Sequence, residues 1–189
     1  MARQMINELR TSPTDAWAWD KTDTKQVAYP GLKELVYDYD LERLAMKRAA
    51  EIALSYDHTR PNGQNPFTIY TEENITRLDA GENIAVASGN EYSTAEAVNN
   101  GWREDNEPYA GQGHRRNMLG YKFTCVGVGH VTYNGYDYWV EEFASRPSIN
   151  TTETPANDSE QTVTVSVTKS WITNYKTYFD QDSYVLRLG

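Results

Sequence analysis

Three polar stretches of this chain hold the residues whose types could do chemistry. They are residues 57–63 (Asp-His-Thr-Arg-Pro-Asn-Gly), 81–85 (Gly-Glu-Asn-Ile-Ala) and 113–119 (Gly-His-Arg-Arg-Asn-Met-Leu). The chain has three histidines, and two of them, His58 and His114, lie in these stretches. Each stretch interrupts apolar, periodic sequence, as loops that carry functional side chains do. The first question is therefore whether these two imidazoles meet carboxylates in space.

Glu82 and the pair Glu104 and Asp105 supply the candidate carboxylates. Two imidazoles with one or two carboxylates around a cleft suit a divalent transition metal, most readily zinc, with water at an open position. The same groups without a metal could form a hydrogen-bonded acid–base cluster. Because the residues are far apart in the sequence, their spacing does not separate these alternatives.

The composition argues against a nucleic-acid partner. The formal net charge is −9 and the isoelectric point about 4.8, whereas a phosphate-binding surface needs clustered lysine and arginine. Arg115 and Arg116 form the one basic pair beside a histidine, and we expect them in surface ion pairs or at a helix N-terminus. No apolar run approaches the roughly 20 residues that span a bilayer. The first residues have no apolar core of signal-peptide type, so the chain is expected to be cytosolic or to have lost a leader.

Helical periodicity predicts the elements that position the polar stretches. Residues 2–9 form an amphipathic pattern, and Asp40 is the expected N-cap of a longer helix over residues 41–53. Arg48 interrupts the apolar stripe of that helix, so it either snorkels or pairs with a buried carboxylate. A capping box at residues 93–96 (Ser-Thr-Ala-Glu) predicts a third helix, which runs through Trp102. A helical turn is expected from His114 to Leu119.

Strand patterns dominate the second half of the chain. Two runs, residues 123–131 and 136–144, are joined by Asn-Gly, which predicts a type I′ hairpin turn. Gly127 and Gly129 lie on one face of the first run, which predicts that a helix packs against its backbone. Glu141 and Glu142 are successive and must face opposite sides, so one of them points inward and could partner Arg48. We expect Cys125 to be buried as a small apolar residue and His130 to be structural.

The domain organisation is predicted to be one main domain with an extension. Helices followed by a hairpin indicate a layered α+β domain over residues 1–149. Residues 150–160 are polar and lack periodicity, which is typical of a linker. Residues 161–189 are strand-prone and too short for an independent domain, so they extend the first domain or begin another module.

The polar stretches occur in the same order, with similar spacing, in a known protein family. Residues 57–63, 81–85 and 113–119, with Trp102 and the acidic residues after it, resemble bacterial members of the CAP superfamily. These SCP-domain proteins are relatives of the cysteine-rich secretory, antigen 5 and pathogenesis-related proteins. The resemblance extends from about residue 2 to residue 145 and includes four motifs. The disulfides of eukaryotic members are absent, since Cys125 stands alone.

The resemblance implies a three-layer α-β-α sandwich with a central, mainly antiparallel sheet. It also implies a cleft with two histidines and two acidic residues, carried over as His58, Glu82, Glu104 and His114. Asp105 is the alternative to Glu104, because the acid of many relatives lies three residues after the tryptophan. Glu104 is preferred on side-chain reach. Family members often bind zinc or another divalent ion through the two histidines.

Three functions are compatible with the resemblance. The first is an exported, extracellular or cell-surface module that holds a divalent metal and binds a lipid, sterol, peptide or component of the cell envelope. The second is a metal-dependent hydrolase or protease, in which zinc on His58 and His114 activates water and Glu82 or Glu104 is the general base. The third is a structural or adhesive module of a larger surface protein, which the linker and the strand-prone extension suggest.

Overall fold

The computed structural model of this chain describes residues 1–153, 161–166 and 183–188. Its centre is a four-stranded sheet in the order β3-β5-β6-β4. The strands are β3 (Val36–Tyr37), β4 (Asp79–Ser88), β5 (Cys125–Tyr133) and β6 (Tyr136–Ser145). The short β3 runs parallel to β5, while β4 and β5 both pair with β6 in antiparallel fashion. The sheet is therefore mainly antiparallel, and β4 forms one of its edges.

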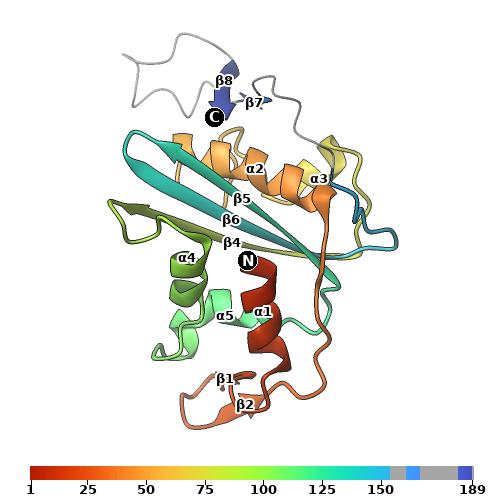
Figure 1. Cartoon of the computed structure of the whole chain (residues 1–189), viewed down its shortest axis with the longest axis vertical. Coiled ribbons are helices and arrows are strands. Elements are labelled where there is room, and N and C mark those ends of the chain that lie inside the picture. The colour runs from red at the N-terminus through yellow and green to blue at the C-terminus, as the bar shows by residue number, and fades with distance from the viewer. Residues whose placement is uncertain (154–160, 167–182, 189) are drawn as a thin grey trace.

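Helices cover both faces of this sheet (Figure 1). One face carries α2 (Tyr39–Leu54) and the short α3 (Thr68–Glu72). The other face carries α1 (Ala2–Thr11), α4 (Ala95–Trp102) and α5 (Gly113–Met118), with the 3₁₀ turn η1 (Tyr109–Gly111) between the last two. The predicted three-layer α-β-α sandwich is confirmed. No helix in the described parts of the chain is both long and apolar enough to cross a bilayer.

Two small hairpins lie outside the central sheet. The strands β1 (Trp17–Trp19) and β2 (Gln26–Ala28) form one of them, at the end of the molecule beyond α1 (Figure 1). The other pairs β7 (Gln161–Ser166) with β8 (Ser183–Leu188), and β7 lies next to α2. Residues 154–160 of the predicted linker and much of the extension lie outside the described residues. The division at residue 150 therefore stays a prediction.

The predicted contact between a helix and the glycine face of β5 is confirmed. A Cβ atom on Gly127 would lie 2.2 Å from the backbone of Leu41 and Glu42, and one on Gly129 would lie 2.2 Å from Ala45. The backbone of α2 therefore rests directly on β5. The adjoining hairpin turn also has the expected conformation, because the residues of its Asn-Gly pair have φ angles of 51° and 79°.

Two helix starts differ from the sequence prediction. Asp38, and not Asp40, is the N-cap of α2, because its side chain accepts a hydrogen bond from the Asp40 amide at 3.0 Å. At α4 the N-cap is Thr94, whose hydroxyl accepts from the Ala97 amide at 3.1 Å. The predicted capping box began one residue too early. Adjacent hydroxyl or carboxylate residues have nearly equal capping ability, so the local pattern does not choose between them.

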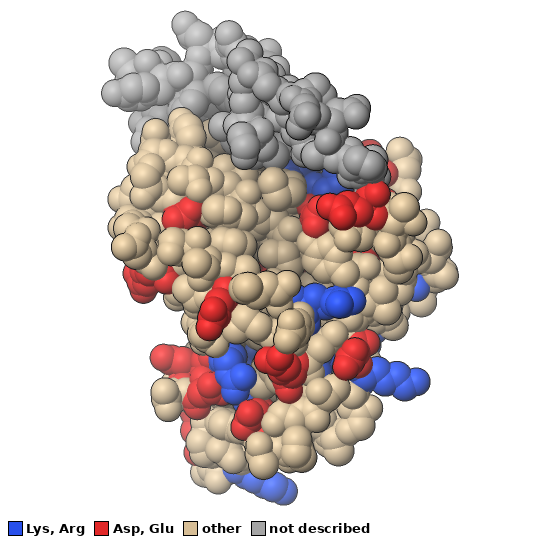
Figure 2. Space-filling view, viewed as in Figure 1, with Lys and Arg blue, Asp and Glu red and all other residues tan. Residues whose placement is uncertain are grey.

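The apolar core includes buried residues on both faces of the sheet. On the α2 side, small residues of α2 pack on Ile84 of β4 and Val140 of β6. On the other side, Trp102 and Phe143 pack with residues of α1 and α5. Cys125 is buried and unpaired, as expected. Acidic and basic side chains are interspersed over the lower part of the face in Figure 2, so charge of one sign is not gathered there.

Candidate functional site

The first histidine is held by a carboxylate on the edge strand. His58 lies in the loop after α2, and its Nδ1 is 2.7 Å from Oε1 of Glu82 in β4. Glu82 is buried, whereas the side chain of His58 is 55 % exposed. Because an ionised carboxylate only accepts hydrogen bonds, Nδ1 carries the proton and Nε2 is left free to accept or to bind a metal.

Glu82 is held in turn by Arg48 of α2. The Arg48 guanidinium donates to both Glu82 oxygens, with Nε 2.6 Å from Oε2 and Nη2 3.2 Å from Oε1. It also donates to Glu51 at 2.6 Å and to the backbone carbonyl of His58 at 3.2 Å. Arg48 was expected either to snorkel or to pair with a buried carboxylate, and the structure shows the pairing. Its partners are Glu82 and Glu51, and not the Glu141 or Glu142 suggested by the strand pattern.

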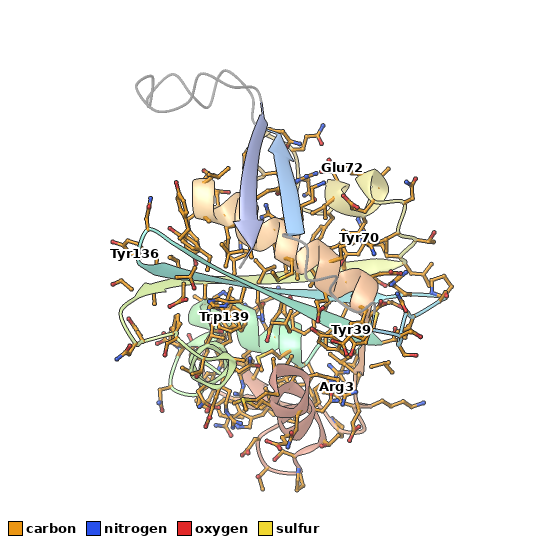
Figure 3. All side chains as sticks on the ribbon, turned by 45° about the horizontal axis from the view of Figure 1, so that its top comes forward. Arg3, Tyr39, Tyr70, Glu72, Tyr136 and Trp139 are labelled. Atoms are coloured by element: carbon orange, nitrogen blue, oxygen red, sulfur yellow. The ribbon has the colours of Figure 1, made fainter. Side chains whose placement is uncertain are left out.

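This ion network continues into the loop that follows His58. Arg60 donates to Glu51 at 2.6 Å and contacts Glu72 of α3 at 2.7 Å. Figure 3 shows Glu72 on the side of the sheet occupied by α2 and α3. Arg48 and Arg60 thus share a buried carboxylate, so the loop that carries His58 is joined by ion pairs to both α2 and α3. A rigid support of this kind is what a binding side chain requires.

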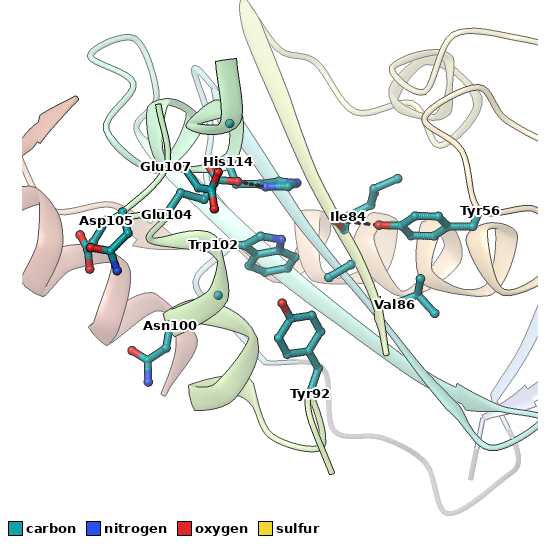
Figure 4. Close-up of a pocket in the computed structure, with 14 residues that line it drawn as sticks. Tyr56, Ile84, Val86, Tyr92, Asn100, Trp102, Glu104, Asp105, Glu107 and His114 are labelled. Atoms are coloured by element: carbon teal, nitrogen blue, oxygen red, sulfur yellow. Dashed lines mark hydrogen bonds and ion pairs between the residues drawn. The ribbon is translucent and has the colours of Figure 1, made fainter. Parts of the chain in front are cut away.

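The second histidine is held in the same way from a different element. His114 opens α5, and its Nδ1 makes a short hydrogen bond with Oε1 of Glu104 (Figure 4). The other oxygen of Glu104 accepts from the Arg115 amide at 3.2 Å. Glu104 itself follows α4 in a left-handed conformation with φ of 48°. A non-glycine residue held there indicates a constrained backbone, which here turns the carboxylate toward His114.

Asp105 has a different role from its neighbour. Its carboxylate pairs with Arg115, and also with Arg103 at 3.0 Å. The structure thus places Glu104, and not Asp105, against His114. Arg115 was expected in a surface ion pair or at a helix N-terminus; it lies near the N-terminus of α5 and pairs with Asp105, but its side chain is fully buried, so the surface alternative is wrong. It donates to the carbonyl of Arg103 and its guanidinium lies 4.6 Å from the ring of Trp17, so it joins three segments of the chain.

The two imidazole–carboxylate pairs lie on either side of β4. Glu82 points toward Arg48 of α2, while the next residue, Asn83, points the other way and donates to the carbonyl of His114 at 3.3 Å. Asn117 of α5 links the two sides, because its amide donates both to the Glu82 carbonyl at 3.1 Å and to the Asn83 side chain at 2.9 Å. The alternation of side chains along one strand therefore positions both pairs.

A pocket of about 530 Å³ lies on the His114 side of this edge. Its walls come from β4, from α4 with the loop after it, and from two tyrosines, Tyr56 and Tyr92 (Figure 4). Trp102 forms part of its wall, and the ring centroids of Trp102 and His114 are 6.0 Å apart. His58 is not among the lining residues. The site therefore consists of a pocket with one imidazole–carboxylate pair and a second pair across the edge strand.

The acidic residues of β4 and β6 differ in their protonation. Burial raises the pKa of Glu82, but the hydrogen bonds from His58 and Arg48 outweigh this effect and hold the pKa below its usual value. Burial raises the pKa of Glu141 to about 8, with an opposing hydrogen bond from Asn83. For Glu142, burial and the nearby Glu82 carboxylate raise the pKa well above its usual value. Near pH 7 Glu82 is therefore ionised and Glu141 is mainly neutral, while burial disfavours the ionised form of Glu142.

The arrangement offers imidazoles rather than a complete metal cage. Among the residues that the structure describes, no group of three or more His, Cys, Asp or Glu side chains is arranged to hold a metal ion. Each carboxylate of the two pairs is already bonded to an imidazole through Nδ1. This leaves Nε2 of His58 and of His114 as the atoms that fit a metal, with the carboxylates as orienting groups. The metal-binding roles of the two histidines stay predictions.

Sequence reasoning missed several residues that support the site. Asn83 and Asn117 lie within the motifs but had no predicted role, although they join the two imidazole–carboxylate pairs. Tyr56 and Tyr92, which line the pocket, lie in stretches with no motif. The one sequence signal for Asn83 and Asn117 was their position close to the predicted site residues Glu82 and His114. The two tyrosines had no such signal. His130, expected to be structural, stacks on Trp139 with ring centroids 4.0 Å apart and bonds Asp137 at 2.7 Å.

Comparisons with known proteins agree with these features. The model of the cysteine-rich secretory protein family, CAP, matches residues 3–143. The protein YkwD of Bacillus subtilis is 30% identical over 149 residues, which cover 76% of this chain and 53% of YkwD. The chain thus spans about half the length of that relative.

Solved structures with the same fold are more distant in sequence. An outer surface protein of Borrelia burgdorferi is 20% identical, with a TM-score of 0.54 over 76% of this chain and 89% of that chain. The structure of NaASP2 with Zn²⁺ is 21% identical, with a TM-score of 0.54 over 82% of this chain and 87% of that chain. The family match, the ordered motifs and the three-layer fold agree, and the chain belongs to the cysteine-rich secretory protein (CAP) family.

Proposed function

We propose that this chain is an extracytoplasmic ligand-binding module whose cleft holds a divalent metal ion, with zinc as the first candidate, through His58 and His114. The observation that carries the proposal is the pairing of both imidazoles with carboxylates through Nδ1. Such a carboxylate fixes the tautomer and ring orientation of a ligating histidine and increases its basicity. The structure of NaASP2 with Zn²⁺ adds support from the same fold.

The carboxylates suit this orienting role better than that of a general base. Both oxygens of Glu82 accept hydrogen bonds from Arg48, and one also contacts His58. Both oxygens of Glu104 are likewise engaged, by His114 and by the Arg115 amide. Hydrogen bonds and ion pairs that stabilise the ionised carboxylate reduce its tendency to take a proton from water or substrate. We therefore rank the binding module above the hydrolase.

A metal held by two imidazoles would take its remaining ligands from water or from a bound molecule. Zinc at such a site supplies a Lewis acid that coordinates an oxygen or nitrogen of the ligand. The pocket beside His114 offers the space for that molecule. Family membership and the outer surface protein with this fold support a location outside the cytoplasm.

Calorimetric zinc titration of the metal-stripped chain near neutral pH tests the proposal. We expect saturable binding that is lost in the double variant His58→Ala/His114→Ala. His130→Ala is the matched control, because that imidazole bonds Asp137 and lies outside the site. Equal binding by the chain and the double variant, or no binding by either, would refute the metal site.

A further inference from the structure

The edge of β4 beside the pocket carries backbone groups that do not pair with β6. The carbonyl of Ile84 accepts from the Tyr56 hydroxyl at 3.3 Å, and the carbonyl of Glu82 accepts from the Asn117 amide at 3.1 Å. Both carbonyls therefore face away from β6. Because backbone groups alternate along a strand, the N–H and C=O of Val86 face the same way. Within residues 1–153, no backbone hydrogen bond outside the β4–β6 ladder occupies them.

This open edge forms one wall of the pocket. Ile84, Ala85 and Val86 line it, and Tyr92 and Trp102 lie across from them (Figure 4). Ile84 packs on the α2 side of the sheet, while Ala85 packs on the α4 side. An extended chain placed along this edge would therefore direct alternate side chains to the α2 side and into the pocket. The backbone N–H and C=O of Val86 are available to such a chain, whereas the Ile84 carbonyl is occupied by Tyr56.

The charge of the pocket selects the kind of chain. Glu104, Asp105 and Glu107 line it, and no lysine or arginine does. Glu104 and Asp105 are paired with His114 and Arg115, but the described residues provide no ion-pair partner for Glu107. An occupant with positive side chains complements this wall.

We propose that the edge of β4 at Ile84–Val86 binds an extended peptide with basic side chains, as an added strand whose alternate side chains enter the pocket beside His114 and Glu107. The proposal names the ligand class of the cleft and so rests on the binding function above. The peptide backbone would pair with Val86, and a lysine or arginine would lie near Glu107. An acyl chain would instead bury three carboxylates against hydrocarbon, which is unfavourable.

The test uses a fluorescently labelled octapeptide of alternating lysine and valine, added to the whole chain at 150 mM salt. We expect saturable binding by fluorescence anisotropy, and none with an octapeptide of alternating glutamate and valine. An octapeptide with the lysine–valine sequence and every backbone nitrogen methylated keeps the charged side chains but has no backbone N–H donors. Its affinity should be at least about tenfold weaker, which is about 1.4 kcal/mol. Equal binding of the methylated peptide would overturn strand addition, and failure of the lysine–valine peptide to bind would overturn the proposal.

V86P and E107Q distinguish the contribution of the backbone contact to peptide affinity from that of the charge, and V86A is the control for V86P. V86P removes an N–H that faces away from β6, so it leaves the β4–β6 ladder intact and should lower peptide affinity at least about tenfold. V86A keeps that N–H and only shortens the side chain, so it should lower the affinity much less than V86P does. E107Q should weaken binding and reduce its dependence on salt. Unchanged affinity in both V86P and E107Q would contradict the proposal, and thermal unfolding shows whether each variant folds.

The zinc titration on the same samples distinguishes this inference from the function on which it rests. Zinc binding without peptide binding would overturn the added strand and leave the metal site standing. Peptide binding without zinc binding would refute the metal site and support a peptide module that needs no metal. A V86P variant that binds zinc normally but has lost the peptide gives the most direct support for the proposal.

Discussion

At the scale of single residues, the site depends on buried charged side chains that hold the two histidines in position. Arg48 is buried between the carboxylates of Glu82 and Glu51, and Glu82 orients His58. On the other side of β4, Glu104 orients His114, and its own backbone is held in a left-handed conformation. Neither imidazole is positioned by its own loop alone, so a change in a supporting residue should affect the site as much as a change in a histidine.

Replacement of Arg48 should strongly destabilise the fold. Arg48→Ala leaves Glu82 and Glu51 without the cation between them, and breaking a buried ion pair in this way costs about 3–5 kcal/mol. Urea unfolding followed by circular dichroism measures the loss. The control is Arg43→Ala, because Arg43 is 58% exposed and makes a surface pair with Asp40. We expect that control to change stability by less than about 1 kcal/mol, and equal losses would contradict the buried network.

The two neighbouring acids after α4 should differ in their effect on the metal. Glu104→Gln weakens the hydrogen bond that orients His114 and should lower zinc affinity by about 10–100-fold. Asp105→Asn should leave zinc affinity unchanged, because Asp105 pairs with Arg115 and Arg103. Both variants are measured by calorimetric titration. A larger loss of affinity in Asp105→Asn than in Glu104→Gln would show that the other acid serves the site.

At the scale of elements, the close approach of α2 to β5 links the fold to the site. The strand can lie against the helix backbone only because Gly127 and Gly129 have no side chain. The same helix carries Arg48, which must reach Glu82 across the sheet face. The distance between α2 and the sheet therefore decides whether the support for His58 can form.

Gly129→Ala should separate these two elements. Its Cβ would lie 2.2 Å from the backbone of Ala45, so α2 or β5 must shift, which costs roughly 3 kcal/mol or more. Gly113→Ala is the control, since nothing lies within 4 Å of a Cβ there and its φ is not positive. That control should be neutral or stabilising by up to about 1 kcal/mol. Thermal unfolding compares the two, and a tolerated Gly129→Ala would argue against the direct backbone contact.

At the scale of the whole molecule, buried acids make stability depend on pH in two opposite ways. Glu82 has a lowered pKa in the folded state, so its contribution is present above its ordinary pKa of 4.5 and is lost as the pH falls below it. Glu141 has a pKa raised by burial to about 8, so its contribution is full below pH 4.5. That contribution is lost as the pH rises from 4.5 to about 8, because the unfolded carboxyl ionises over this range while the buried one keeps its proton.

Glu141→Gln should remove this second dependence. The amide stays neutral, so the part of the stability loss between pH 5.5 and 8.5 that comes from Glu141 should vanish in the variant. Urea unfolding at the two pH values gives the difference for each protein. Comparing the two differences removes any effect of the substitution on unfolding free energy that does not depend on pH. Parallel pH dependences in the variant and the parent chain would show that Glu141 does not titrate in this range.

The sequence by itself determined the features that depend on local pattern. The period of apolar residues in α2, the Asn-Gly turn and the two glycines of β5 each restrict the backbone or one face within a few residues. The histidine motifs also followed from the sequence, through their order and resemblance to a family. Helix starts were off by one or two residues, because nearby residues such as Asp38 and Asp40 can both cap.

Only the tertiary structure decided which charged residues meet. It placed Glu104 rather than Asp105 against His114, and buried Arg115 between segments about 100 residues apart in the sequence. These outcomes depend on the left-handed backbone at Glu104 and on which groups remain unpaired once the layers pack. The physical reason is that a local pattern sets the conformation of its own segment. The partner of a charge is set instead by desolvation and geometry across segments that the sequence does not place together.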